Sequence, residues 1–526
     1  MQQINQDRDG TLLIVQVDVP QNETTGDFYY RTAAPGLGMA QCEGVQVVNL
    51  TNIHRYRFEA MAEADVLVLN NICDADLLPL IRDRKARGQL TVYELCDDME
   101  ALPPSNPLKA FYDLPENMLL MKRLAHYCDA LQFCSPVLRE KMGYLNSNCA
   151  VFPNHMLEIP PERPRKPGDA LIVGWGGSLG HREDMEKIAQ RLVHWVLSRP
   201  NVNLHLMCDE SIRRLFAPLP EERKKWFAPG PLESYYRFVS QLDIGIAPLE
   251  DTPFNRSRSD VKFIEYAAHG VVPVLQAVGP YLLNVQHGKT GFLFHSTDEL
   301  ISTLDRLAAS PDLVANVSES ARAYVLRERR QLDRGRDRVD FYRSLLSGRN
   351  AGGPGGRGRA ELLSRMASKE NACGPTGRNR PKHLLLRSTA YENLLQAGLH
   401  AYDEQHPGRS LGFFREAMRL EPGLYEPYLF GAFLSKDPIG MLQEAIKRNP
   451  RSIISRIHLG KAYSDRGMRA EAVESFKAAA GIFTEYERPY IECANFLNEA
   501  GFQQEGISML KKALELIPKV IREPAK

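Results

Sequence analysis

The chain of 526 residues is too long for one hydrophobic core, because cores stop growing at about 250–300 residues, so we expect roughly three domains. An apolar fraction of 43% and a charged fraction of 25% exclude a mainly disordered or fibrous protein. The formal net charge of +1 excludes a global field that would draw the chain onto nucleic acid, so any anion site must be local.

The N-terminal sequence lacks a basic region followed by a long apolar one, and no stretch reaches the roughly 18 apolar residues of a membrane-spanning helix. The nine cysteines are scattered and contain no C-x-x-C pair, which predicts reduced core residues and no structural zinc site. We therefore expect a cytoplasmic protein, or one peripheral at the inner face of the membrane, with no transmembrane segment.

β-rich segments alternate with amphipathic stretches from Leu12 to about Val151. The β-rich segments are LLIVQVDV, VQVVNL, ADVLVLNN, LTVYELCDD, DALQFCS and CAVFPN. This alternation predicts a parallel sheet with crossover helices, so residues 1–160 are expected to form a Rossmann-like domain. The proline-rich segment Ile159 to Asp169 then interrupts the pattern, as linkers between domains often do.

The alternation resumes after that joint and predicts a second Rossmann-like domain over residues 168–347. Its expected strands are ALIVGWGGS, VNLHLMC, LDIGIAPL, VVPVLQA and GFLFH, with helices over about 182–198 and 260–269. A helical tail completes it, so the fold class is α/β up to residue 347. Residues 348–384 follow, rich in glycine and, from Gly348 to His383, carrying eight Lys/Arg against two Glu. They predict a flexible basic linker; weak attraction to an acidic surface is the alternative.

From residue 385 to 520 the sequence is helical and self-similar. Residues recur at an offset of 34: Ala445 with Ala479 and Ala513, Phe476 with Leu510, and Gly467 with Gly501. That period is typical of tetratricopeptide repeats. An offset of 28 between Ala417 and Ala445 makes one repeat six residues short. We predict an all-α solenoid of about four helix pairs whose concave surface binds a protein partner.

The segment from Asp243 to Gly291 holds the candidate site. A helix opening at Ser259-Asp260-Val261-Lys262, with Ser259 as its N-cap, would turn its positive dipole end toward the cleft beyond the strand ends. A diphosphate binds at such an end, and Lys262 would supply a cation to it. Glu265, three residues on, lies on the same helix face and could accept hydrogen bonds from two ribose hydroxyls.

Polar residues just before this helix are within reach of phosphate or sugar hydroxyls: Asn255, Arg256 and Arg258. We assign Arg256 to catalysis with Lys262, and Asn255 and Ser259 to donor binding. Both catalytic cations would stabilise negative charge on the leaving group, an effect usually worth a few kcal/mol per donor.

The sequence S-D-V-K-F-I-E-Y-A-A-H-G-V-V-P-V from Ser259 to Val274 resembles the GT-B glycosyltransferases of the family-four, retaining type. D-I-G-I-A-P-L before it and G-K-T-G-F-L after it extend the resemblance, which covers Ala170 to about Leu346 and, more loosely, Leu12 to Asn154. It implies that Lys262 holds the donor diphosphate without a metal and that Glu265 binds the ribose. It also implies that the first domain faces the acceptor and that helical residues after Leu332 cross back onto that domain. Many family members have a further Glu where Ser257 stands here, which leaves the donor sugar open.

Other residues are candidates with a plain structural alternative. Gly177 and Ser178 follow the first strand of the second domain and are assigned to donor binding, although a tight turn explains them equally. His181 and Arg182 come next, and we interpret them as surface residues at a helix start, the alternative being that they add positive charge at the diphosphate. His126 and His155 are interpreted as structural histidines.

The first domain offers three acceptor-side candidates. Arg31 lies in the loop after the first strand, where helix entry is the alternative. Asp97 and Asp98 end the strand VYELCDD on the cleft side. We assign Asp97 to the acceptor and Asp98 to catalysis, the alternative being that one of them caps the following turn. Asn154 is interpreted as fixing the interdomain joint.

The function expected from this resemblance is transfer of a sugar from a nucleotide sugar, with retention, to a protein or to a cell-envelope polysaccharide or lipid-linked acceptor. No cofactor is expected. The alternative is a weak or inactive GT-B scaffold whose repeats recruit a protein partner. An epimerase or a phosphorylase on the same fold is a third option, which the absence of an evident pyridoxal-binding lysine context disfavours.

Overall fold

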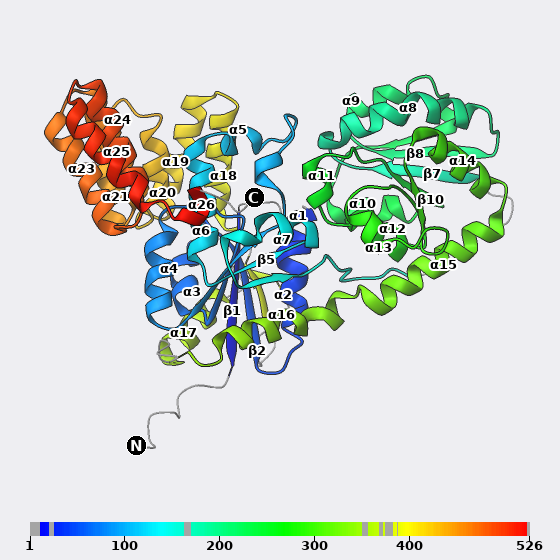
Figure 1. The fold of residues 1–526 in the computed structure, drawn as a ribbon, viewed down its shortest axis with the longest axis horizontal. Helices are drawn as coiled ribbons and strands as arrows, with labels where there is room; N and C mark the ends of the chain where they lie inside the picture. The colour runs from blue at the N-terminus through cyan, green and yellow to red at the C-terminus, as the bar shows by residue number, and fades with distance from the viewer. Residues whose placement is uncertain are drawn as a thin grey trace, which may run out of the picture.

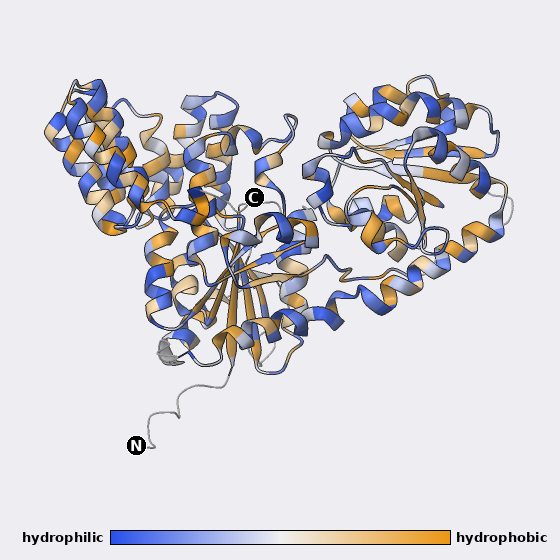
Figure 2. Ribbon diagram, viewed as in Figure 1, coloured by the Kyte–Doolittle hydropathy of each residue, from blue (hydrophilic) through white to orange (hydrophobic). Residues whose placement is uncertain are grey.

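Two parallel β-sheets and a stack of paired helices make up the described chain (Figure 1). This computed structural model describes residues 11–19, 26–161, 170–349, 356–367, 372–373, 382–386 and 388–522. Figure 2 shows hydrophobic residues concentrated on the strands of both sheets, whereas the helices mix hydrophobic and hydrophilic residues. The order of elements confirms the predicted fold class, two Rossmann-like domains followed by helical repeats.

The first sheet has eight described strands in the order β13-β14-β2-β1-β3-β4-β5-β6, and β13 alone among them is antiparallel to its neighbour. The strands are β1 Leu12–Asp18, β2 Val45–Thr51, β3 Val66–Asn70, β4 Leu90–Leu95, β5 Ala130–Phe133, β6 Cys149–Val151, β13 Ala372–Cys373 and β14 His383–Leu386. The helices are α1 Gly26–Phe28, α2 Ala34–Met39, α3 Arg57–Glu63, α4 Leu77–Ala86, α5 Lys109–Tyr112, α6 Pro115–Tyr127 and α7 Pro136–Met142.

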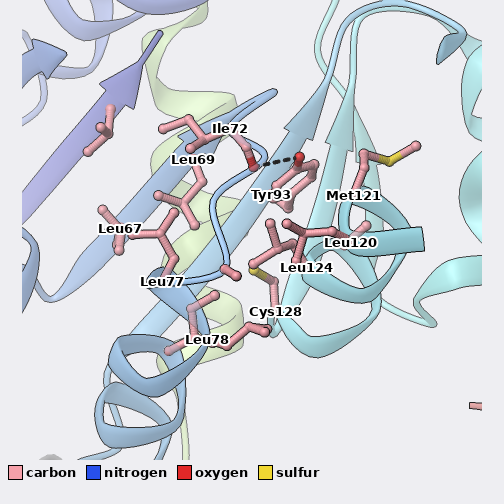
Figure 3. Packing of buried hydrophobic residues seen from close by; sticks show 14 of the residues in the cluster. Leu67, Leu69, Ile72, Leu77, Leu78, Tyr93, Leu120, Met121, Leu124 and Cys128 are labelled. Atoms are coloured by element: carbon pink, nitrogen blue, oxygen red, sulfur yellow. Dashed lines mark hydrogen bonds between the residues drawn. The ribbon is translucent and has the colours of Figure 1, made fainter. Parts of the chain in front are cut away.

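Apolar side chains of β3, α4 and α6 pack together over this sheet (Figure 3). Leu67 and Leu69 of β3 belong to one buried cluster with Leu120 of α6. Within this cluster the Tyr93 hydroxyl donates to the Ile72 carbonyl at 2.9 Å, so the buried phenol is satisfied. The strands are hydrophobic along their whole length because helices cover both faces of a parallel sheet.

The second sheet has six described strands, all parallel, in the order β12-β11-β10-β7-β8-β9. They are β7 Leu171–Gly176, β8 Val202–Met207, β9 Lys224–Phe227, β10 Ile244–Ala247, β11 Val272–Gln276 and β12 Phe292–Phe294. The helices are α8 Arg182–Leu197, α9 Glu210–Arg213, α10 Leu232–Val239, α11 Pro253–Ser257, α12 Val261–Ala268, α13 Pro280–Asn284 and α14 Thr297–Ala308. Residues 162–169 of the predicted proline-rich joint lie outside the described residues.

Two long helices, α15 (Pro311–Glu328) and α16 (Gln331–Leu346), lead from the second domain back to the first (Figure 1). Gly335 lets α16 approach α2 closely, because a Cβ at this position would overlap the Gly38 carbonyl. The Tyr342 hydroxyl donates to the Gln132 side chain of β5 at 2.8 Å. The helical residues after Leu332 therefore pack on the first domain, as expected.

The predicted linker contains structure where it is described. Helix α17 (Gly356–Met366) buries Leu362, Leu363 and Met366 in the core of the first domain. Strand β14 pairs in parallel with β2 and extends the first sheet. A plain flexible tether is therefore wrong for residues 356–367 and 382–386, because both segments carry apolar side chains that the first domain buries. Residues 350–355, 368–371 and 374–381 of the linker lie outside the described residues, and the predicted domain boundaries stay predictions.

The C-terminal helices form the predicted antiparallel pairs. They are α18 Ala390–Asp403, α19 Pro407–Leu420, α20 Glu426–Ala432, α21 Pro438–Arg448, α22 Ile453–Asp465, α23 Arg469–Ile482, α24 Arg488–Glu499, α25 Gln503–Leu516 and the short α26 Lys519–Arg522. Gly467 and Gly501, at the offset of 34, follow the ends of α22 and α24 with φ of +70° and +86°, the left-handed conformation that ends helices. One repeat is short because its helix α20 has only 7 residues, whereas helix α22 of the next repeat has 13.

The repeats are packed against the first domain. The carboxylate of Asp76, at the start of α4, accepts hydrogen bonds from the repeats. Oδ1 accepts from the Ile453 amide at 2.7 Å, and Oδ2 accepts from the Tyr425 hydroxyl at 2.9 Å. Buried ion pairs join the same two parts: Arg57 with Glu426, and Arg123 with Glu487. Because these groups are buried, their pairing fixes the orientation of the repeats on the first domain.

Candidate active site

A cavity of about 710 Å³ lies between the two Rossmann-like domains. Its walls come from residues at or after the carboxyl ends of strands β1, β4, β5 and β6 in one sheet and β7, β8, β9, β10 and β11 in the other. Ligand sites of parallel α/β sheets form at this edge, and cavities of about 300–1,000 Å³ suit small organic ligands. The lining residues that the sequence predicted are Arg31, Asp97, Gly177, Ser178, Ser259, Lys262 and Glu265.

Helix α12 begins at the cavity. It starts at Val261 with Asp260 at the N-cap, so the prediction of Ser259 as N-cap is wrong by one residue. The Ser259 hydroxyl instead accepts from the Asn154 amide at 3.0 Å, across the domain boundary. The Asp260 carboxylate is held by two hydrogen bonds of 2.7 Å from Arg329. Since that negative charge is neutralised, the positive end of α12 can attract an anion in the cavity.

Lys262 lies in the first turn of α12 and lines the cavity. Its ammonium donates to the Tyr235 hydroxyl at 2.7 Å and lies 3.5 Å from Glu265 Oε2. Nζ is also 4.2 Å from the Tyr235 ring centroid. Burial lowers the pKa of Lys262, while the Glu265 carboxylate opposes that shift. A diphosphate bound here would add negative charge and so favour the ammonium form.

The Glu265 carboxylate is bound by tyrosines from both domains. Oε1 accepts from the Tyr30 hydroxyl at 2.9 Å, and Oε2 accepts from the Tyr235 hydroxyl at 2.9 Å. A further hydrogen bond of 2.6 Å joins the hydroxyls of Tyr30 and Tyr236. Because Tyr30 belongs to the first domain, this network links the two halves of the cavity. Each carboxylate oxygen can accept more than one hydrogen bond, so these contacts leave capacity for ligand hydroxyls.

Arg258 lines the cavity, whereas the predicted Arg256 does not. Arg256 is exposed and forms a two-point ion pair with Asp251 at the surface. The Arg258 guanidinium donates to His181 Nε2 at 3.2 Å, and His181 Nδ1 donates to Asp184 at 2.8 Å. Burial lowers the pKa of His181, which keeps the ring neutral and able to accept from Arg258. The local cation besides Lys262 is therefore Arg258, and His181 is more than a surface residue.

Two further residues predicted on the donor side, Asn255 and Gly177, make contacts within the protein. Asn255 does not line the cavity; it is buried, and its side chain donates to the Glu250 carbonyl at 3.0 Å. Gly177 does line it, but its amide donates to the Met207 carbonyl at 3.0 Å. A Cβ at Gly177 would meet the Trp175 ring at 2.5 Å. Packing against Trp175 therefore explains this glycine without a ligand.

Of the two aspartates after β4, one lines the cavity and the other does not. Asp98 does not line the cavity: Oδ2 accepts from Lys141 at 2.6 Å, and Oδ1 caps the turn by accepting from the Glu100 amide at 3.1 Å. The capping alternative thus describes Asp98, and its assignment to catalysis is wrong. Asp97 lines the cavity, where burial and the nearby Asp27 raise its pKa to about 6.

Arg31 lies in the cavity wall as part of a buried polar network. Its guanidinium forms an ion pair with Glu94 and donates to Asn154 Oδ1 at 2.7 Å and to the Phe152 carbonyl at 2.8 Å. Asn154 also contacts Ser259, so it joins the two domains, in line with the interpretation from sequence. These contacts position the hinge as well as the cavity wall.

Ser257, which stands where the sequence resemblance would place a further Glu, is buried outside the cavity. Its hydroxyl donates to the Phe254 carbonyl at 2.7 Å, and its carbonyl accepts from Ser135 of the first domain at 2.5 Å. No carboxylate therefore enters the cavity from this position. Sequence reasoning missed Tyr30, Tyr235 and Tyr236, because a tyrosine carries no motif that separates a site residue from a core residue.

The chain is similar to several solved structures at low sequence identity. No protein-family model matches the sequence, and no curated protein matches it. One similar solved structure is Anabaena Alr3699/HepE in complex with UDP and glucose, at 14% identity over 63% of this chain and 100% of that chain, with a TM-score of 0.48. Another is a glycosyltransferase from Rickettsia africae ESF-5, at 13% identity over 64% of this chain and 99% of that chain, with a TM-score of 0.47. MamA shares 23% identity over 24% of this chain and 77% of that chain, with a TM-score of 0.23.

Two features are absent from the described residues. No group of three or more His, Cys, Asp or Glu side chains in this part of the chain is arranged to hold a metal ion. Within the same residues, none of the helices has the length and apolar character to span a membrane. Lys262, Arg258 and the start of α12 are positive groups that line the cavity, whereas Arg31, which also lines it, is paired with Glu94.

Proposed function

We propose that this protein is a glycosyltransferase of the GT-B type that takes a sugar from a nucleotide sugar. The observation that carries the proposal is the placement of Lys262, Glu265 and the start of α12 in one cavity at the facing edges of two parallel sheets. A helix end with a lysine suits a diphosphate, and a carboxylate one turn away suits a ribose diol.

The proposed roles follow from the contacts around each group. Lys262 and Arg258, with the α12 amides, stabilise the charge that grows on the leaving diphosphate. Glu265 accepts hydrogen bonds from the ribose, in part by exchanging the Tyr30 hydroxyl for a ligand hydroxyl. We further propose transfer with retention, through an oxocarbenium-like transition state, without a metal for the diphosphate. Closure of the two domains would exclude water from the cavity.

In this proposal the acceptor is a protein, a cell-envelope polysaccharide or a lipid-linked sugar. Asp97 orients the acceptor hydroxyl that receives the sugar. The repeats recruit a protein partner through the surface that the first domain leaves uncovered. We place the enzyme in the cytoplasm or at the inner face of the membrane. These assignments rest on the arrangement of the domains and on the sequence resemblance.

The direct test of the function is turnover of a panel of radiolabelled nucleotide sugars by the full chain. We expect one donor at least to raise the melting temperature, because ligand binding stabilises the folded state, and the same donor to be consumed. Release of a free hexose phosphate would instead point to a phosphorylase. A failure of every common nucleotide sugar to shift the melting temperature would contradict the proposal.

The second candidate function is a scaffold that has lost transferase activity. It is favoured by Ser257, which supplies no carboxylate, and by the tyrosine hydroxyls that bind both oxygens of Glu265. A scaffold would bind its partner through the repeats and show no turnover with any donor. Turnover that depends on Lys262 would exclude it.

Activity should depend on pH through Asp97. Because the pKa of Asp97 is raised to about 6, its carboxyl is charged above that pH and neutral below it. If the carboxylate orients the acceptor hydroxyl, kcat/KM for the acceptor should fall about tenfold per pH unit below about pH 6. Asp97→Asn should lower kcat/KM at pH 7 and flatten this limb. The control is Asp113→Asn, which changes an exposed carboxylate paired with Lys109 and should keep the wild-type pH profile. An unchanged pH profile in Asp97→Asn would refute the role of Asp97 in orienting the acceptor.

A further inference from the structure

A second cavity, of about 550 Å³, lies at the hinge between the two Rossmann-like domains. It forms where the segment after β6 meets the turn between α15 and α16, beside a parallel bridge between Met156 and Arg330. Among the described residues, none lines both this cavity and the one that holds Lys262. Its charged lining residues are four arginines and two acids: Arg327, Arg329, Arg334, Arg338, Glu328 and Asp337.

The arginines of this cavity are incompletely neutralised. Glu328 divides its carboxylate between two of them: Oε1 accepts from Arg327 at 2.8 Å, and Oε2 accepts from Arg334 at 3.0 Å. Arg329, in contrast, is fully matched by Asp260. One carboxylate thus serves two guanidinium groups. With Asp337 counted, two lining acids face the three arginines that Asp260 does not match, so positive charge remains on the cavity wall.

Arg338 is a buried cation of the cavity, with 3% of its surface exposed. Its Nη1 has no hydrogen-bond partner among the described residues. The nearest carboxylate oxygen, Glu94 Oε2, is 3.6 Å away and accepts from Gln132, while the other oxygen pairs with Arg31. The guanidinium carbon lies 4.7 Å from the Phe152 ring centroid. A buried donor without a partner is costly, so a ligand that accepts from Nη1 would complete this site.

His155 in the same wall lies in a positive environment, which affects its pKa. Burial and then the charges of Arg329, Arg338 and Arg334 lower its pKa to about 2. The imidazole is therefore neutral and adds a hydrogen-bonding group without a charge. Further neutral polar groups line the rest of the cavity: Asn284, Gln286, Tyr324 and Gln331.

We propose that the hinge cavity binds a small phosphate dianion, either inorganic phosphate or a small phosphomonoester, through Arg338 and Arg334. Guanidinium groups suit phosphate because their fork of N–H donors matches two phosphate oxygens. The cavity exceeds the size of phosphate alone, and its neutral polar lining suits the organic part of a phosphomonoester. This site does not depend on transferase activity, because its residues are separate from those of the donor cavity.

Calorimetric titration of the full chain with inorganic phosphate and with glycerol 3-phosphate, at constant ionic strength, tests the proposal. Arg334 is half-buried, so Arg334→Gln should keep the fold and lower the affinity at least tenfold, because it removes a charge-assisted contact. Arg336→Gln is the matched control, since it removes the same charge from an exposed position on α16. Lys262→Ala should leave phosphate binding at the hinge unchanged.

The outcomes separate the two sources of the ligand. Tighter binding of glycerol 3-phosphate identifies a phosphomonoester site, and equal binding identifies a site for phosphate itself. Absence of binding to the wild-type chain would overturn the proposal, as would equal affinity in Arg334→Gln and Arg336→Gln. Loss of all binding in Lys262→Ala would show that the anion occupies the donor cavity instead. Loss of turnover alone, with hinge binding intact, would count against the transferase function only.

Discussion

Replacing Lys262 with alanine should lower kcat for sugar transfer by about 100- to 1,000-fold, the usual cost of removing one preorganised group that stabilises charge in the transition state. Lys262 lies at the start of α12, and its ammonium contacts Tyr235 and Glu265 inside the cavity. The variant should remain folded, because the alanine keeps the helix. Initial rates at saturating donor, with circular dichroism of both proteins, measure the effect.

The matched control is Lys187→Ala. Lys187 lies on α8 with 65% of its side chain exposed, and its partner is the surface carboxylate of Glu250. Its removal deletes the same charge from the same domain without touching the cavity, so the rate should stay within about twofold, as exposed ion pairs contribute little. Normal turnover by Lys262→Ala would remove this lysine from the mechanism, and an equal loss in both variants would point to a nonspecific effect of charge.

Asp76→Ala should lower the free energy of unfolding of the first domain and its repeats by about 2–4 kcal/mol, because buried donors left without a partner cost about 1–3 kcal/mol each. The carboxylate accepts from the Ile453 and Ile454 amides and from the Tyr425 hydroxyl. Urea denaturation followed by circular dichroism suits this measurement. Tryptophan fluorescence does not, since the three tryptophans, Trp175, Trp195 and Trp226, all lie in the second domain.

Asp83→Ala provides the control for the repeats. Asp83 also joins α4 to the repeats, through Arg451 at 2.6 Å, but this pair is partly exposed to solvent. We expect a loss of at most about 1 kcal/mol. Hydrogen exchange should then show faster exchange at the start of α22 in Asp76→Ala than in Asp83→Ala. Equal stability of the two variants would mean that the buried carboxylate does not hold the repeats in place.

Periodicity and local motifs predicted the fold because their signals lie within single elements. Alternating apolar segments indicated both sheets, and the glycines at Gly467 and Gly501 indicated helix ends that adopt the left-handed conformation. The helix that carries Lys262 and Glu265 was placed to within one residue. The docking of the repeats was not predictable, since it depends on Asp76, whose partners lie more than 340 residues further along the chain.

Side-chain direction explains the wrong site assignments. Arg256 and Arg258 stand two residues apart, and only the turn after α11 decides that Arg258 faces the cavity while Arg256 pairs with Asp251. Likewise, Asp97 and Asp98 are adjacent after β4, but Asp97 lines the cavity, whereas Asp98 does not and pairs with Lys141 of α7. Neither outcome follows from composition or spacing, because each depends on a partner from another element.

A crystal structure of the full chain with a bound nucleoside diphosphate tests the central claim most directly. The account predicts the diphosphate within hydrogen-bond distance of Lys262 Nζ and of the first amides of α12, with the ribose hydroxyls on the Glu265 carboxylate. A nucleotide seated elsewhere, or a diphosphate that leaves Lys262 and the α12 end unoccupied, would contradict it.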